Sequence, residues 1–221
     1  QTVRFGNKNS SAQFVDFDFY APSYHAPASF IACPIYDGEK QVGVLAVQVP
    51  IDEINRAANF NLDWQKNGLG ITGEVLIVGS DTKLRNNKRL LVENQAKYLE
   101  LMQNIEADTA KIANIKRFNS SILTETMQSK SFSAAISGHS GFTTEDNQFN
   151  DYVFSSYRPL KLPEMNWVVI AQIEATEAFE EIINMSIIIT VIVLLLMYLA
   201  VYAAKKMTEK IILPIQRLNH A

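Results

Sequence analysis

The residues whose chemistry best suits a binding site include two arginines, Arg85 and Arg89, which follow a short apolar stretch. A guanidinium offers forked hydrogen-bond donors that match a carboxylate or another anion. The same side chains would also suit a solvated strand edge with an ion pair between two domains. Ligand binding and a structural ion pair are therefore both open at these positions.

A second set of polar residues flanks a later stretch that has the pattern of central strands. The set consists of Asp146, Asp151, Tyr152 and Tyr157. A carboxylate beside tyrosine hydroxyls can bind an amine or another polar group, whereas tyrosines packed under helices would give the same pattern. Much earlier in the chain, Tyr20 and Tyr24 either line another pocket or form the turn before a strand.

The sequence lacks the residue patterns of catalytic and metal sites. It has no G-x-S-x-G or H-E-x-x-H motif, and His25, His139 and His220 lie far apart. Gly68–Gly73 matches the G-x-G-x-x-G pattern of dinucleotide sites but precedes a strand-like stretch instead of following one, which favours a simple turn. We expect no catalytic residue, no metal and no cofactor in this chain. Any catalytic output would lie C-terminal to it.

The most apolar stretch of the chain, residues 182–204, predicts a transmembrane helix. From Met185 to Ala204 it has no charged residue, and about 20 apolar residues are enough to cross a bilayer. Lys205 and Lys206 follow directly, so the positive-inside rule places the C-terminal side in the cytoplasm and the preceding residues outside it. An unusually apolar helix of a soluble protein is the alternative.

The residues after this stretch, 205–221, resemble the opening of a HAMP linker. Ile211, Ile212, Ile215 and Leu218 recur at helical spacing around Pro214. One such helix cannot bury its apolar face alone, so we predict a parallel homodimer. An amphipathic helix that lies on the lipid surface is the alternative.

Two blocks of secondary structure precede the membrane segment. In the first, alternating residues predict strands at 14–20, 29–37 and 41–50, which form an antiparallel meander, and a helix at 51–59. In the second, a strand at 73–81 and a return strand from 82 to 87 lead into a helical stretch from 89 to about 129. Three strands follow, at 140–146 (SGFTTED), 151–160 and 166–174. This order predicts an α+β fold, a PAS-like antiparallel sheet with a long helical crossover, plus part of a second such module.

Several stretches together resemble the ectodomains of bacterial double-Cache receptors, which belong to chemoreceptors, sensor cyclases and sensor kinases. They include FYAPSYHAPASFIACPIYDGEKQVGVLAVQVPIDEIN, GLGITGEVLIVGSDTKLRNNKR, FNSSILTE and NWVVIAQIEATEAFEEI. The resemblance implies the C-terminal part of a membrane-distal module at 1–58 and a membrane-proximal module at 59–181. The transmembrane helix at 182–204 and the HAMP-like segment at 205–221 would follow. The chain would then lie in a bacterial inner membrane with its N-terminal side in the periplasm.

The function expected from this resemblance is sensing of a small-molecule ligand of unknown identity, with the lipid bilayer and a second copy of the chain as further partners. The formal net charge of −3 argues against a nucleic-acid surface, which needs clustered Lys and Arg. The family often has Arg-Ser-x-Ser-Arg where this chain has Arg85–Arg89, so the family's ligand does not transfer directly. A module that docks a periplasmic protein, or only dimerises, is the alternative function.

Overall fold

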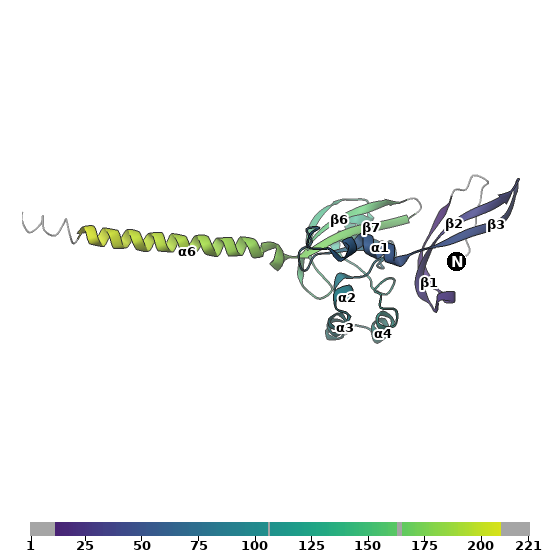
Figure 1. Ribbon diagram of the computed structural model, residues 1–221, viewed down its shortest axis with the longest axis horizontal. Coiled ribbons are helices and arrows are strands. Elements are labelled where there is room, and N and C mark those ends of the chain that lie inside the picture. Colours follow the sequence, from purple (N-terminus) through teal and green to yellow (C-terminus); the bar gives the residue numbers. More distant parts are fainter. Residues whose placement is uncertain (1–11, 106, 163–164, 209–221) are drawn as a thin grey trace, which may run out of the picture. The chain divides into compact units, whose positions relative to one another are not determined.

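The computed structural model describes residues 12–105, 107–162 and 165–208. The chain divides into two units, Gln1–Ala175 and Thr176–Ala221. The described part of the first unit contains two antiparallel sheets and several short helices, and that of the second is helical (Figure 1). The predicted α+β class is confirmed.

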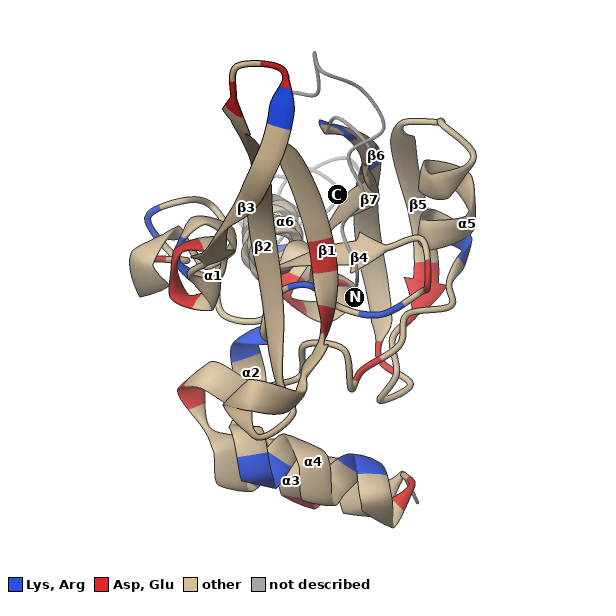
Figure 2. Cartoon of the chain, turned by 90° about the vertical axis from the view of Figure 1, so that its right-hand side faces the viewer, with Lys and Arg blue, Asp and Glu red and all other residues tan. Residues whose placement is uncertain are grey.

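The first sheet has three strands, β1 (Gln13–Tyr20), β2 (Ala26–Asp37) and β3 (Lys40–Val49), each antiparallel to its neighbour. Between β1 and β2 lies a 3-10 turn, η1 (Ala21–Ser23). Between β2 and β3, Gly38 adopts φ +57°, the left-handed conformation that a tight hairpin needs. Charged residues occur on β2 and β3 only at this hairpin tip (Figure 2). The predicted meander is confirmed.

Helix α1 (Ile51–Ala58) follows the first sheet and carries Asp52 and Glu53 in its first turn. There, carboxylates interact favourably with the positive end of the helix dipole. A second 3-10 turn, η2 (Phe60–Leu62), and the Gly68–Gly73 stretch then lead into the second sheet. As predicted, the glycine motif forms turns before a strand, with Gly68 and Gly70 at positive φ.

The second sheet has four antiparallel strands in the order β4-β7-β6-β5. They are β4 (Glu74–Gly79), β5 (Gly141–Asp146), β6 (Tyr152–Leu162) and β7 (Met165–Glu174). Strand β7 is therefore paired along both edges, with β4 on one side and β6 on the other. Leu76, Val78, Val168 and Ile170 from β4 and β7 form a buried core with Leu84 and Phe132.

The predicted return strand at 82–87 is wrong, because only single bridges, Val78 with Leu84 and Lys83 with Thr126, form there. The side chain of Asn86 takes the place of a backbone partner at the free edge of β4. Its Oδ1 accepts from the Ile77 N–H at 2.6 Å, and its Nδ2 donates to the Val75 carbonyl at 2.8 Å. The edge is thus satisfied without a fifth strand.

The predicted helical stretch from 89 to about 129 is divided into three helices and ends early. The helices are α2 (Arg89–Glu93), α3 (Gln95–Asn104) and α4 (Thr109–Phe118). Leu91, Tyr98, Met102 and Ile115 pack together as expected, but Ile105 is 43% exposed. Ile122 and Leu123 lie in turns and still reach a core, beside Phe17 and Trp167. A further helix, α5 (Lys130–Ile136), was not predicted.

Helix α6 (Ala175–Met207) contains the whole predicted membrane segment, 182–204, and is long and apolar enough to cross a bilayer. It begins directly after β7, which ends at Glu174. Of the HAMP-like segment, 205–221, residues 205–207 belong to α6, and everything from residue 209 onward lies outside the described residues.

Candidate functional site

Arg85 lies in the interior and joins the two sheets of the first unit. It is 2% exposed, and its Nε and Nη2 donate to the two carboxylate oxygens of Asp16 on β1, both at 2.9 Å. Its Nη1 donates to the Lys83 carbonyl at 2.9 Å. The Trp167 indole N–H from β7 also donates to Asp16, at 3.1 Å. Protein groups thus occupy the Arg85 guanidinium, which favours the structural ion pair over a ligand contact.

Burial and hydrogen bonding have opposite effects on the pKa values of this pair. Burial alone would raise the pKa of Asp16, but the hydrogen bonds from Arg85 and Trp167 outweigh it and hold the pKa below the usual Asp value. Burial likewise would lower the pKa of Arg85, and the contacts with Asp16 raise it. Gly79 lies against the guanidinium, where any Cβ would collide with it.

Arg89 is 7% exposed and links the Gly68–Gly73 turns to α2 through hydrogen bonds. Its Nη1 donates to the carbonyls of Gly70 and Gly73, at 3.1 and 2.7 Å, and its Nε pairs with Glu93 at 2.9 Å. The guanidinium also lies 4.6 Å from the ring centre of Trp64. Arg89, like Arg85, is held by the protein itself.

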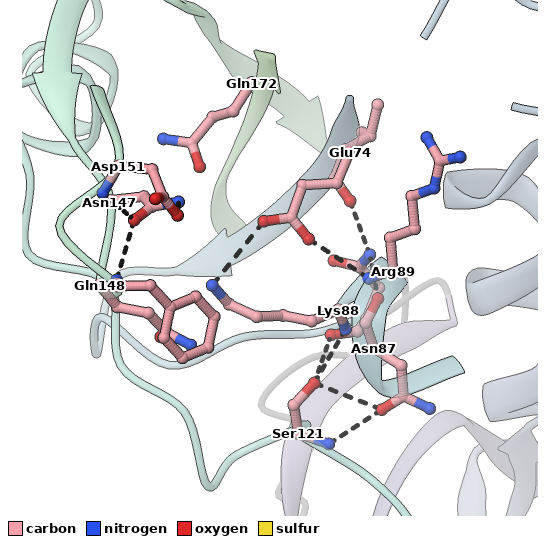
Figure 3. A network of polar contacts seen from close by, with 12 residues as sticks. Glu74, Asn87, Lys88, Arg89, Ser121, Asn147, Gln148, Asp151 and Gln172 are labelled. Atoms are coloured by element: carbon pink, nitrogen blue, oxygen red, sulfur yellow. Dashed lines mark hydrogen bonds and ion pairs between the residues drawn. The ribbon is translucent and has the colours of Figure 1, made fainter. Parts of the chain in front are cut away.

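Lys88 lies between these arginines in sequence, and its side chain points toward Glu74 (Figure 3). Lys88 lines the two cavities that are described next. The residue is 8% exposed, and its backbone N–H donates to the Ser121 hydroxyl at 3.0 Å. Its ammonium lies 3.7 Å from Glu74 Oε1 and 5.8 Å from the centre of the Phe149 ring. Among the described residues no hydrogen bond to this ammonium is formed, because 3.7 Å is too long for one.

The first cavity, which we call the amide cavity, has a volume of about 340 Å³. Its apolar lining is made by Leu76, Leu84 and Met127. Its polar lining includes Lys88, Asp146 and the side-chain amides of Asn147, Gln148 and Gln172. Such a combination of an apolar wall with a few polar groups is typical of small-molecule sites.

Gln172 of β7 is held in a fixed orientation behind the amide cavity. Its Nε2 donates to Ser155 Oγ at 3.0 Å and to Glu145 Oε1 at 3.3 Å. Glu145 also accepts from the backbone N–H and the hydroxyl of Ser131. Burial would raise the pKa of Glu145, but these hydrogen bonds outweigh it and lower the pKa. Protein acceptors therefore take both amide hydrogens of Gln172, and its carbonyl oxygen is left as an acceptor.

The second cavity, which we call the acidic cavity, has a volume of about 460 Å³ and shares Lys88 and Asn147 with the first. Its carboxylates come from Glu74, Glu93, Asp151 and Glu174. Glu174 is the last residue of β7, and its N–H donates to Thr72 Oγ1 at 3.1 Å. The acidic cavity therefore borders the point where β7 passes into α6.

The loop between β5 and β6 contributes to both cavities and is folded around Asn147. The Asn147 Oδ1 accepts from the N–H groups of Phe149 and Asp151, at 2.8 and 2.9 Å, and its Nδ2 donates to Asp151 Oδ2 at 3.1 Å. This local network places Asp146 at the amide cavity and Asp151 at the acidic cavity.

The structure thus brings Asp146 and Asp151 beside Lys88, but not the predicted tyrosines. Tyr152 is 54% exposed, and Tyr157 packs half-buried against the core. The other two lie at the first sheet. Tyr20 contacts Phe30 at a separate apolar hollow of about 210 Å³, and Tyr24 is 82% exposed at φ 55°.

The sequence reasoning missed Lys88, Glu74 and Gln172. A usable signal existed for Gln172, which interrupts an otherwise apolar strand, NWVVIAQIE, at a position that the structure shows to be 6% exposed. Lys88 was hidden in the basic run between two arginines. Within the described residues, no group of His, Cys, Asp and Glu side chains could hold a metal ion.

No family model matches the sequence, and a search of curated proteins finds no match either. Several solved structures are similar to the chain. The ligand-binding domain of the Pseudomonas fluorescens chemoreceptor CtaA, in complex with L-serine, is 14% identical with a TM-score of 0.42; the match covers 76% of this chain and 56% of that one. The periplasmic sensory domain of the Campylobacter jejuni chemoreceptor Tlp1 is 16% identical with a TM-score of 0.46, covering 80% and 53%.

A third similar structure is the ligand-binding domain of the amino acid chemoreceptor PctB of Pseudomonas aeruginosa PAO1 in complex with L-Arg. It is 15% identical with a TM-score of 0.45, and the match covers 76% of this chain and 56% of that one. The chain therefore spans little more than half the length of the structures to which it is similar.

Proposed function

We propose that this chain is the extracytoplasmic sensing region of a membrane receptor, with the helix that carries its signal into the cell. The observation that carries the proposal is the continuity of β7 with α6. Gln172 of β7 lines the amide cavity and Glu174 lines the acidic cavity, and α6 begins at the next residue, Ala175. Occupation of either cavity acts on the strand that enters the apolar helix.

A ligand can shift such a receptor only by binding one of its two states more tightly, with a coupling of roughly 1–3 kcal/mol. A strand paired on both edges is a suitable element for this, because its position depends on the whole sheet. Strand β7 both lines the cavities and leads directly into α6. A change in its position on ligand binding therefore needs no additional linker to reach the helix.

The direction of the signal follows from the charges around α6. Glu177 lies in its first turn, and Lys205 and Lys206 lie in its last. By the positive-inside rule, these charges support a cytoplasmic Lys205 and a periplasmic first unit in a bacterial cell. The proposal includes the two modules at 1–58 and 59–181, a parallel homodimer, and a HAMP-like continuation from residue 205.

Cysteine labelling in spheroplasts tests this orientation. In a Cys33→Ser background, Ser140→Cys introduces a thiol in the loop before β5, and Lys205→Cys introduces one at the end of α6. We expect a membrane-impermeant maleimide to label position 140 in intact spheroplasts, and position 205 only after permeabilisation. The reverse pattern would overturn the receptor orientation.

Ligand binding is tested by the melting temperature of the detergent-solubilised chain against a panel of amino acids, carboxylates, amines and purines. We expect stabilisation by at least one class, because a ligand that binds only the folded state raises its stability. If no member of the panel changes the melting temperature, the alternative of a protein-docking or dimerisation module is favoured instead.

A further inference from the structure

We propose that the amide cavity binds a small monocarboxylate, with the Lys88 ammonium as the group that holds the carboxylate. This inference rests on the proposed sensing function and names the ligand class of one of its cavities. It begins from the unsatisfied state of Lys88. A lysine ammonium has three hydrogen-bond donors, and burial without partners is costly for a charged group.

The neighbouring arginines provide an internal comparison. Arg85, Lys88 and Arg89 are all less than a tenth exposed. Each guanidinium donates hydrogen bonds to carboxylate and carbonyl oxygens of the protein. Among the described residues, the Lys88 ammonium has a charge partner, Glu74, at 3.7 Å, and the Phe149 ring at 5.8 Å, but no hydrogen-bond acceptor. Of the three cations in this short segment, the two arginines have hydrogen-bond acceptors within the protein. The ammonium of Lys88, between them, keeps its donors available to the cavity.

The backbone fixes Lys88 in this orientation. Its N–H is bound by Ser121 Oγ at 3.0 Å, and the next residue, Arg89, donates its N–H to Glu74 Oε2 at 3.2 Å. Glu74 is thereby held at a distance from Lys88 that balances its charge without using its donors. An anionic oxygen that enters the cavity can accept the hydrogen bonds that Glu74 does not.

The cavity lining selects the class of anion. Among the described residues that line it, Lys88 is the one cation, and Asp146 adds a negative charge. Because Glu74 and Asp146 are both negative, each further charge on a ligand adds repulsion, so a single carboxylate fits better than phosphate or a dicarboxylate. The Leu76, Leu84 and Met127 side chains suit a short apolar chain, and the Gln172 carbonyl can accept a donor from the ligand.

The test is titration of the full chain in detergent with acetate, butyrate and glycine, and with phosphate and succinate as multivalent anions. Binding is followed by isothermal calorimetry. We expect the monocarboxylates to bind more tightly than phosphate or succinate. We expect Lys88→Met to weaken their binding at least about tenfold, since a hydrogen bond to a charged group contributes that much or more.

Lys116→Met is the matched control, because Lys116 is an exposed lysine of α4 that does not line the amide cavity. It should bind like the unaltered chain. In the single variant, the unpaired charge of Glu74 could destabilise the fold. The double variant Lys88→Met/Glu74→Gln removes both charges and so provides a folded chain for the same binding measurement. The double variant should also lose monocarboxylate binding.

The outcomes separate this inference from the proposed function. If amines or purines bind but no monocarboxylate does, the ligand class is wrong while the sensing function stands. Binding that is equal in Lys88→Met, or equal for phosphate and butyrate, also overturns the inference. If no ligand of any class binds, both are overturned.

Discussion

The ion pair between Asp16 and Arg85 links the two sheets of the first unit. Asp16 comes from β1 and Arg85 follows β4, and Trp167 of β7 donates to the same carboxylate. Phe17 and Trp167 pack directly beside them in an apolar cluster. Loss of Asp16 would leave the buried Arg85 guanidinium with Asp81, 2.9 Å from its Nη2, as its remaining carboxylate partner, and breaking such a pair costs more than the pair itself contributes.

Replacement of Asp16 should therefore change stability in a pH-dependent way. The folded-state pKa of Asp16 is lowered from 3.8, so its contribution is present above that value and is lost as the pH falls through the folded-state value. We expect Asp16→Asn to lower stability by about 2 kcal/mol at pH 7, and the difference from the unaltered chain to shrink as the pH falls below 3.8. Glu145, whose pKa is also lowered, accounts for acid sensitivity that remains in the variant.

The measurement is the melting temperature from tryptophan fluorescence between pH 3 and pH 7, in detergent. Asp18→Asn is the matched control, since Asp18 lies on the same strand but is exposed. Its curve should follow that of the unaltered chain. Equal effects of the two substitutions would show that Asp16 has no special role.

Among single residues, the sequence identified the chemical types better than their roles. Asp146 and Asp151 could be predicted as cavity residues because they flank the β5–β6 loop, and loops at strand ends border pockets. Arg85 could not be told from a ligand group, because its partner Asp16 lies far away in sequence. Nor could Arg89, because its acceptors include the Gly70 and Gly73 carbonyls of a separate turn. The direction of Lys88 depends on Ser121, which lies 33 residues further along the chain.

At the scale of elements, the edge of β4 depends on one amide side chain. Asn86 is fully buried and satisfies the Ile77 N–H and the Val75 carbonyl. Asn86→Ala should lower the free energy of unfolding by about 2–3 kcal/mol, because two enclosed backbone groups lose their partners. Asn86→Asp should be at least as destabilising at pH 7, because it buries a carboxylate whose oxygen would face the Val75 carbonyl.

Urea titration of the solubilised chain, followed by tryptophan fluorescence, measures this difference. Asn104→Ala serves as the control, since Asn104 is the exposed last residue of α3. It should change stability by less than about 0.5 kcal/mol. An Asn86→Ala variant as stable as the control would contradict the proposed role of the amide.

The elements that the sequence predicted well are those with a strict apolar period. All three strands of the first sheet and the last three of the second follow the predicted ranges to within a few residues. The return strand failed because alternation cannot distinguish a strand from a segment whose side chain replaces a backbone partner. The helical stretch was predicted too long because Ile122 and Leu123 keep helical spacing while lying in turns, with Leu123 at φ 58°.

At the scale of the whole molecule, membrane anchoring depends on the apolar centre of α6. Arginine near the middle of a membrane helix costs about 2.5–3.5 kcal/mol per residue. The double change Leu194→Arg/Leu195→Arg should therefore shift the chain from the membrane pellet to the supernatant after alkaline carbonate extraction. Leu194→Ala/Leu195→Ala should stay in the pellet. Retention of the arginine variant would argue against a spanning helix.

The pairing of β7 on both edges limits how this strand can move. A slip of β7 by one residue, about 3.3 Å, would turn Val168 and Ile170 out of the core and invert every contact of the strand. Sliding of this strand past its neighbours is thus excluded as a signal. Any motion that arrives at Ala175 must therefore carry β7 together with β4 and β6, as a shift or a twist of the sheet as a whole.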